Sequence, residues 1–237
     1  MPLVPRSSTK IEPYWVSDCG RATLYLADCL KVLPILQGSI DAIVTDPPYG
    51  VNFQYLSYSD KQEGYQEWCA SWFAECQSVC KGPIAISCGI SNLCDWPKPD
   101  WVMCWHKPAC MGRCTIGFNN WEPILVYGKS RGKQTSDVVR APITPDDSLY
   151  GHPCPKPLGW GLGIVEKLTI VGDTVLDVFT GSGTTGVACI ELDRKFIGIE
   201  IEEKYCDIAI GRIRRKLIEK GYAKDTPPPA RTKLGRK

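Results

Sequence analysis

Residues 174–186 read Thr174-Val-Leu-Asp177-Val-Phe179-Thr-Gly-Ser-Gly-Thr-Thr-Gly186, an apolar run followed by a glycine-rich turn. The apolar run predicts a buried strand over 174–178, and the pattern after the turn predicts a helix over 185–192. Glycines allow the backbone to approach a ligand closely, and a helix N-terminus offers unpaired N–H groups. A strand, a glycine turn and a helix in this order are typical of α/β folds that bind nucleoside-containing cofactors, oxidoreductases included.

Short β-rich runs alternate with helical patterns along the chain. This alternation predicts an α/β fold with a mostly parallel, seven-stranded sheet and helices on both faces. The predicted strands cover 23–27, 40–45, 83–87, 101–105, 123–127, 174–178 and 196–200, and the predicted helices cover 62–80, 157–168, 185–192 and 203–220. Residues 129–150 are polar and have no clear period, so we expect a loop or a small insertion there.

A second motif, Asp46-Pro47-Pro48-Tyr49, follows the predicted strand 40–45. An acidic-Pro-Pro-aromatic turn suits a flat base that carries an amino group, because the Asp46 carboxylate and the Pro47 carbonyl can accept the hydrogens of the amine. The prolines fix the turn, which holds both oxygens in place before reaction. Tyr49 offers a flat face on which an extruded base can stack. The position at the carboxyl end of a strand favours a catalytic site over a plain turn with a helix-capping Asp.

Together the two motifs resemble those of the amino-methyltransferases, the S-adenosylmethionine-dependent DNA methyltransferases that modify adenine N6 or cytosine N4. Here the catalytic motif precedes the cofactor motif, which is the order of the family's beta group and a circular permutation of the more usual one. The resemblance covers about residues 20–218 and implies a Rossmann-like methyltransferase fold. It also implies S-adenosylmethionine as cofactor, no metal requirement, and double-stranded DNA as substrate.

The resemblance assigns cofactor-binding roles to several residues. Phe179, Gly181 and Gly183 are implied to cradle the methionine end of the cofactor, and Glu200, which ends the next strand, to accept the ribose hydroxyls. The segment 152–157, His-Pro-Cys-Pro-Lys-Pro, is similar to the family's element that contacts the cofactor carboxylate. Asp28 matches the acidic residue that reaches the adenine. The complete expected cofactor site is Asp28, Cys29, His152, Lys156, Pro157, Asp177, Phe179, Gly181, Ser182, Gly183, Thr184, Thr185 and Glu200.

The target base is also implied by the resemblance. Asp at the first position of the catalytic motif goes mostly with adenine in this family, whereas Ser is commoner for cytosine N4. We therefore expect site-specific methylation of adenine N6 in DNA by base flipping, with cytosine N4 as the alternative. RNA methyltransferases usually carry Asn-Pro-Pro-Tyr with the cofactor motif first. An oxidoreductase, or a DNA-binding module without activity, would leave Asp46-Pro-Pro-Tyr49 without a role.

Positive charge is concentrated near the C-terminus. Residues 204–237 hold 11 of the 28 Lys and Arg residues but only 3 of the 26 Asp and Glu residues. Such a segment attracts a phosphate backbone, or it forms a solvated tail. Loop cations are expected to meet DNA phosphates, namely Lys107, Arg113, Lys129, Arg131 and Lys133. Cys104, His106, Cys110 and Cys114 lack the spacing of a zinc knuckle, so no metal site is expected there. Trp105 is expected to wall the base pocket.

The predicted organisation is a single catalytic domain over 11–220. Residues 1–10 include Leu3-Val-Pro-Arg6, which resembles a protease site left by an expression vector, and residues 221–237 are predicted to form a basic disordered tail. The sequence shows neither a signal peptide nor an apolar run of membrane-spanning length. We therefore expect reduced cysteines and a cytoplasmic, nucleoid-associated protein encoded by a bacterium or phage.

Little room remains for a target-recognition domain, because residues 129–150 form the only long segment of suitable position. Three solutions stay open: relaxed or short-site specificity, recognition supplied by the partner in a homodimer, or recognition by the loops 51–62 and 106–120.

Overall fold

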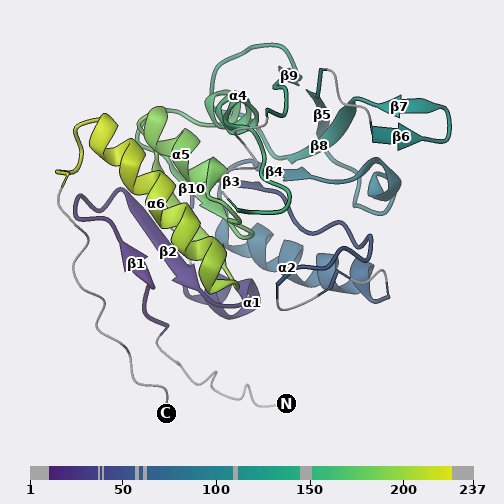
Figure 1. The fold of residues 1–237 in the computed structure, drawn as a ribbon. Helices are drawn as coiled ribbons and strands as arrows, with labels where there is room; N and C mark the ends of the chain where they lie inside the picture. The colour runs from purple at the N-terminus through teal and green to yellow at the C-terminus, as the bar shows by residue number, and fades with distance from the viewer. Residues whose placement is uncertain are drawn as a thin grey trace, which may run out of the picture.

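The computed structural model describes residues 11–36, 38, 40–56, 59–60, 63–108, 112–144 and 151–225. A nine-stranded sheet with the strand order β1-β2-β11-β10-β3-β4-β8-β5-β9 forms the centre of the molecule (Figure 1). Its strands are β1 (Trp15–Val16), β2 (Ala22–Leu26), β3 (Ala42–Thr45), β4 (Ile84–Ser87), β5 (Trp101–His106), β8 (Trp121–Tyr127), β9 (Val138–Arg140), β10 (Thr174–Asp177) and β11 (Lys195–Glu200). A separate hairpin consists of β6 (Gly112–Cys114) and β7 (Gly117–Asn119).

Helices lie on both faces of the sheet. They are α1 (Cys29–Val32), α2 (Tyr65–Val79), α4 (Leu158–Leu168), α5 (Thr184–Glu191) and α6 (Glu203–Glu219), with short 3₁₀ turns at Leu33–Ile35 and Ile90–Asn92. The predicted α/β class and mostly parallel sheet are confirmed, and each of the seven predicted strands and four predicted helices is present. None of the helices in the described part of the chain is long and apolar enough to cross a membrane.

The predicted number of seven strands is too low, because β1 and β9 extend the sheet at its two edges. β9 lies inside 129–150, which was expected to be a loop, and it pairs in parallel with β5. Only Val139 of its three residues is buried, so the strand is too short to produce a hydrophobic period. The predicted start of the tail also shifts: Tyr222, beyond α6, lies under the Arg21 guanidinium and donates to Asp193.

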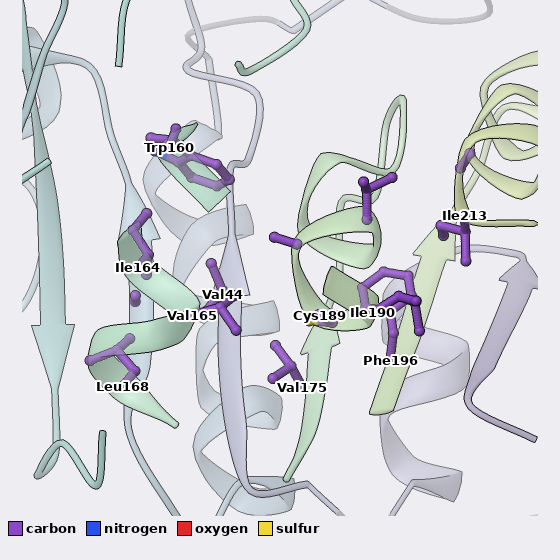
Figure 2. Close-up of a cluster of buried hydrophobic side chains, with 14 of the residues drawn as sticks. Val44, Trp160, Ile164, Val165, Leu168, Val175, Cys189, Ile190, Phe196 and Ile213 are labelled. Atoms are coloured by element: carbon purple, nitrogen blue, oxygen red, sulfur yellow. The ribbon is translucent and has the colours of Figure 1, made fainter. Parts of the chain in front are cut away.

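The central strands are buried on both faces, as parallel strands between helical layers are. Successive residues point to opposite sides: Val44 and Val175 face α4, α5 and α6, whereas Ile43 and Leu176 face α1 and α2. Figure 2 shows Val44 and Val175 beside the apolar face of α4, with Phe196 nearer to α6. This alternation fixes the register of the strands, because a slip of one residue would turn every core side chain to the wrong face.

The strand order changes direction between β3 and β10, which are parallel neighbours. From β10 the chain crosses over through α5 to β11 on one side, and from β3 it crosses over through α2 to β4 on the other side. Open α/β sheets bind ligands outside the carboxyl ends of the strands at such a switch point. The two motifs of the sequence follow these two strands, so the topology brings them together.

Candidate active site

One hydrogen bond joins the two motifs at the carboxyl ends of β3 and β10. The Thr45 hydroxyl donates to Asp177 Oδ1 at 2.7 Å, and the Phe179 backbone N–H donates to the same oxygen at 3.1 Å. Burial raises the pKa of Asp177 to about 6, although these donors oppose the shift. Asp177 therefore holds the catalytic turn and the glycine-rich turn in a fixed relation.

A cavity with a volume of about 760 Å³ opens at this edge of the sheet. It is lined by all four residues of the Asp46–Tyr49 motif and by every expected cofactor residue except Pro157 and Gly183. Pro157 caps the N-terminus of α4. Gly183 has φ +82°, and a Cβ there would lie 2.8 Å from the Ala209 Cβ, so this glycine allows α5 to pack on α6. Gly183 does not line the cavity, and its contact with the cofactor stays a prediction.

The glycine-rich turn is held from two sides. Gly181, with φ +51°, donates its N–H to Glu200 Oε2 at 2.7 Å. Arg212 of α6 donates to the Ser182 carbonyl at 2.7 Å and to the Thr184 hydroxyl at 3.1 Å. Arg212 was not among the residues expected to support this turn, so sequence reasoning missed this anchor.

Glu200, at the end of β11, is a buried carboxylate on the cavity wall. Its Oε1 accepts the N–H groups of Ile201 and Glu202, each at 2.9 Å. Burial raises the pKa of Glu200 to about 7 against the opposing effect of these hydrogen bonds. Next along the edge, after β2, Asp28 accepts the Leu30 N–H at 3.0 Å and caps α1.

Five polar side chains form a buried network on the catalytic side. Lys156 Nζ lies 2.7 Å from Asp46 Oδ2 and 4.0 Å from Glu122 Oε2. The Tyr49 hydroxyl lies 2.8 Å from Asp46 Oδ1 and 3.0 Å from Glu122 Oε2, and its single proton serves one acceptor at a time. Lys107 Nζ closes the network 2.6 Å from Glu122 Oε1.

The charges of this network depend on one another. Burial raises the pKa of Asp46, and the Lys156 ammonium opposes that shift. For Lys156, burial acts to lower the pKa, but Asp46 and Glu122 outweigh it and the pKa is raised. For Glu122, burial acts to raise the pKa, but Lys156 and Lys107 outweigh it and the pKa is lowered. Lys156 and Glu122 are therefore both charged at neutral pH.

Sequence reasoning missed the residues that support the catalytic turn. The Tyr65 hydroxyl of α2 donates to the Pro48 carbonyl at 2.9 Å, and the Asn92 amide donates to the Tyr49 carbonyl at 2.6 Å. Glu122 comes from β8, which runs antiparallel to β4. A Glu within the apolar strand Trp121–Tyr127 was the available signal for a buried polar role.

Comparison with known proteins agrees with this site. A family model described as DNA methylase, covering enzymes that act on N6 and N4 amines, matches residues 40–211. The chain belongs to the N6-adenine/N4-cytosine DNA methyltransferase family. It is 42% identical to the type II methyltransferase M2.DpnII of Streptococcus pneumoniae, over 85% of this chain and 92% of that protein. It is 28% identical to the DNA adenine methyltransferase YhdJ of Escherichia coli K12, over 78% and 79% of the two chains.

Solved structures of methyltransferases share the fold. The cytosine-N4-specific PvuII DNA methyltransferase matches with a TM-score of 0.68 over 86% of this chain and 89% of that chain, at 17% identity. The M1.HpyAVI complex with S-adenosylmethionine matches with a TM-score of 0.63 at 26% identity, over 81% of this chain and 98% of that chain. The predicted family and the predicted cofactor, S-adenosylmethionine, are confirmed.

The cavity of the methyltransferase fits this cofactor. Asp28, Glu200, Phe179 and Asp46 follow β2, β11, β10 and β3, which are neighbours in the sheet in that order. The row thus begins at Asp28, which is expected to reach the adenine, passes Glu200, which is expected to accept the ribose hydroxyls, and ends at Asp46 in the catalytic turn. Phe179 gives the row an apolar wall with Trp68 of α2, their ring centroids being 5.4 Å apart. The volume lies within the usual range of small-molecule sites.

Four of the five cations expected to meet DNA are ion-paired within the protein or lie away from the cavity. Lys107 is buried and ion-paired with Glu122, so it has no free charge for a phosphate. Arg131 pairs with Asp41 and Asp173, which precede β3 and β10, and Lys133 pairs with Glu166. Lys129 follows the end of β8, which pairs with the start of β4. These last three cations therefore lie at the sheet edge opposite to the cavity, and their contact with DNA phosphates stays a prediction.

Arg113 keeps an exposed position on the β6–β7 hairpin. Trp105 lines the cavity as expected, and its indole N–H donates to the Ala141 carbonyl at 2.9 Å. No group of three or more His, Cys, Asp or Glu side chains that could hold a metal ion occurs in the described ranges, which omit Cys110.

Proposed function

We propose that this methyltransferase transfers a methyl group from S-adenosylmethionine to the exocyclic N6 amine of adenine at a specific sequence in double-stranded DNA. The observation that carries the proposal is the position of Asp46, at the end of the strand next to the cofactor cradle and inside the same cavity. Its Asp-Pro-Pro-Tyr motif and the similarity to an adenine methyltransferase both favour adenine.

The residues of the site suit attack by an amine nitrogen. An N–H of the target amine donates to the Asp46 carboxylate, which favours the geometry with the lone pair on the nitrogen. The cofactor supplies an electrophilic methyl group on its sulfonium. Positive charge then develops on the amine nitrogen, and a fixed carboxylate beside it stabilises that charge. One amine proton leaves after the transfer, so a general base of high pKa is not needed.

We further propose that the base enters the cavity by flipping. The side chain of Asp46 is 22% exposed and lines the cavity together with Tyr49 and Trp105. An amine inside a stacked duplex cannot reach such a carboxylate, so the nucleotide has to leave the stack. The Tyr49 ring lies on the cavity wall, where an extruded base would stack.

Cytosine N4 is the second candidate, because cytosine presents an equivalent amine and the fold is shared with a cytosine-N4-specific enzyme. Single-molecule sequencing of DNA from expressing cells distinguishes the two, since it reports the modified base together with its sequence context. We expect N6-methyladenine at one short motif, and none in cells that express the Asp46→Ala variant. Detection of N4-methylcytosine instead would favour the cytosine-N4 activity over the adenine-N6 activity. Unmodified DNA in cells that contain a folded, cofactor-binding protein would contradict both activities.

We place the enzyme in the restriction–modification class, since several relatives are type II methyltransferases. In that setting the DNA is chromosomal or phage DNA in a bacterial cytoplasm. Recognition by a homodimer partner remains part of this proposal, and sedimentation of the enzyme with and without DNA tests it.

A further inference from the structure

Lys156 connects the two halves of the active site. Its backbone carbonyl accepts a hydrogen bond from the hydroxyl of Thr184, the first residue of α5, at 2.9 Å. Its side chain extends to the other half, where Nζ lies 2.7 Å from Asp46 Oδ2 and 3.4 Å from the Tyr49 hydroxyl. The same residue therefore begins at the cofactor cradle and ends on the catalytic carboxylate.

This ion pair conflicts with the reaction. The Lys156 ammonium lies on one oxygen of Asp46 and the Tyr49 hydroxyl on the other, so neither oxygen is open to a target amine. Methyl transfer also places positive charge on the amine nitrogen. An ammonium that already neutralises Asp46 removes most of the stabilisation that the carboxylate offers to this charge. Lys156 therefore has to leave Asp46 before the base can react.

The cavity itself provides a reason for Lys156 to leave. Among the described residues on its wall, Lys156 is the only Lys or Arg, whereas seven Asp and Glu side chains line it: Asp28, Asp46, Asp60, Glu63, Glu122, Asp177 and Glu200. His152 cannot supply a positive charge at neutral pH, because burial, together with Lys156 and Arg212, lowers its pKa to about 4. A carboxylate that enters this cavity finds one cationic partner on the wall.

We propose that Lys156 masks Asp46 in the cofactor-free enzyme and is drawn away by the carboxylate of S-adenosylmethionine, so that cofactor binding exposes Asp46 before the base enters. The inference rests on the proposed function, because it assumes that Asp46 receives the target amine. It makes Lys156 a positioning residue that acts on catalysis through Asp46. Binding then has a preferred order, with the cofactor first and the base second.

The proposal has a thermodynamic consequence that needs no DNA. Asp46 and the cofactor carboxylate compete for one ammonium, and such coupling between two sites is reciprocal. Removing the charge of Asp46 should therefore tighten cofactor binding, although Asp46 belongs to the catalytic half. A role for Asp46 in catalysis alone would leave cofactor affinity unchanged.

Isothermal titration with S-adenosylmethionine tests this in the full chain. We expect Asp46→Asn to tighten binding by about fivefold, the scale of one partly buried charge pair, and Lys156→Met to weaken it by about tenfold. The double variant should bind like Lys156→Met, because the effect of Asp46 passes through Lys156. Glu219→Gln on α6 changes net charge by the same amount at an exposed site and should have no effect.

A second probe lacks the amino-acid end of the cofactor. 5′-Methylthioadenosine has the nucleoside and an uncharged thioether but neither the carboxylate nor the α-ammonium group, so its affinity should be the same in all these variants. Thermal melting of each variant checks that it is folded.

The outcomes separate the two proposals. Unchanged or weaker binding by a folded Asp46→Asn variant would overturn the masking of Asp46, as would a tightening that persists without Lys156. Both results are compatible with an adenine methyltransferase. A folded wild-type protein that methylates no DNA would instead contradict the proposed function, whatever the binding cycle shows.

Discussion

Asp46 is a carboxylate whose two oxygens already have partners in the free enzyme, Lys156 on one and Tyr49 on the other. Its backbone is fixed by Pro47 and Pro48, and the turn is held by Tyr65 and Asn92. The fixed backbone makes the Asp46 carboxylate a preorganised acceptor once Lys156 has left it.

Replacing this carboxylate should stop the chemistry and spare the cofactor site. We expect Asp46→Ala to lower the rate of methyl transfer by about 100-fold or more while S-adenosylmethionine still binds. Single-turnover assays with tritiated cofactor measure the rate, and titration measures the binding. Methylation of cognate DNA at the wild-type rate would show that another group orients the amine.

Glu200 makes cofactor binding sensitive to pH. Its pKa of about 7 lies above the ordinary carboxyl value, so the folded protein retains a proton on it at pH 6. As the pH rises from the ordinary carboxyl pKa of 4.5 to the folded-state pKa of about 7, ionisation of Glu200 lowers the folding stability. The ionised carboxylate is, however, the acceptor that two ribose hydroxyls need. We expect the affinity for S-adenosylmethionine to rise by about tenfold from pH 6 to pH 8.

The matched variant is Glu200→Gln. It should bind S-adenosylmethionine more weakly than the wild type, and its affinity should depend much less on pH. Asp177, with a pKa of about 6, titrates nearby and accounts for any remainder below pH 7. Titrations at several pH values in the two proteins measure the effect. An equal slope in wild type and Glu200→Gln would assign the titration to Asp177.

The sequence predicted the two motifs on the cavity wall, because both follow strands and act through local backbone geometry, but it named fewer than half of the residues that line the cavity. It could not predict that Lys156 reaches Asp46, 110 positions earlier, or that Glu122 completes the network. These partners meet only through the strand order, and no local pattern reports which cation pairs with which carboxylate.

Among the elements, the β6–β7 hairpin is placed to approach the substrate. It connects His106, the end of β5, to Trp121, the start of β8, and Figure 1 shows it extending away from the sheet. Ile116 at its tip is 95% exposed and Phe118 is 57% exposed. β5 ends on the same side as the carboxyl end of β4, so the hairpin lies at the edge that carries the cavity.

Arg113 on this hairpin should contribute to DNA binding. We expect Arg113→Ala to weaken binding and to lower the slope of log affinity against log salt by about 0.9, the value for one phosphate contact. Arg131→Ala is the control, since Arg131 pairs with Asp41 and Asp173 at the opposite edge. Fluorescence anisotropy over a salt series measures both. If both variants lower the DNA affinity and the salt slope equally, the total charge of the protein, and not the position of Arg113, determines DNA binding.

Long elements were predictable and short ones were not. α2 and α6 show a clear apolar stripe, and the central strands show continuous apolar runs bounded by turns. β1, β9 and α1 have two to four residues and owe their conformation to neighbours, such as the pairing of β9 with β5. Tertiary contact rather than local propensity decides such segments.

At the scale of the whole molecule, part of the basic C-terminal charge is used internally. α6 has 17 residues, a length of about 25 Å, and it runs from the cavity edge after β11 to the opposite edge. There Lys216 pairs with Glu191 and Lys220 pairs with Asp193. The surplus that remains for DNA is therefore smaller than the sequence count indicated.

Of the eleven cations in residues 204–237, Arg231, Lys233, Arg236 and Lys237 lie in residues 226–237, which are outside the described residues. We expect their deletion to weaken DNA binding and to reduce the salt slope, without changing the methylated base or its sequence context. Anisotropy and sequencing measure the two properties. An unchanged DNA affinity and salt slope would show that residues 226–237 do not contact DNA.

The switch between β3 and β10 has a consequence for how such genes can be rearranged. Each strand brings its own motif to the shared edge, and the hydrogen bonds of the sheet hold the two together whichever is synthesised first. In the segment that joins the two halves in the chain, 129–150, the described residues 129–144 contribute β9 alone to the sheet. A gene opened within that segment, with its old ends connected by a linker, would encode the same active site in the opposite motif order. Two separate protein fragments, divided within residues 129–150, should likewise assemble by pairing β3 with β10. Such a split methyltransferase would be active only when both fragments are present.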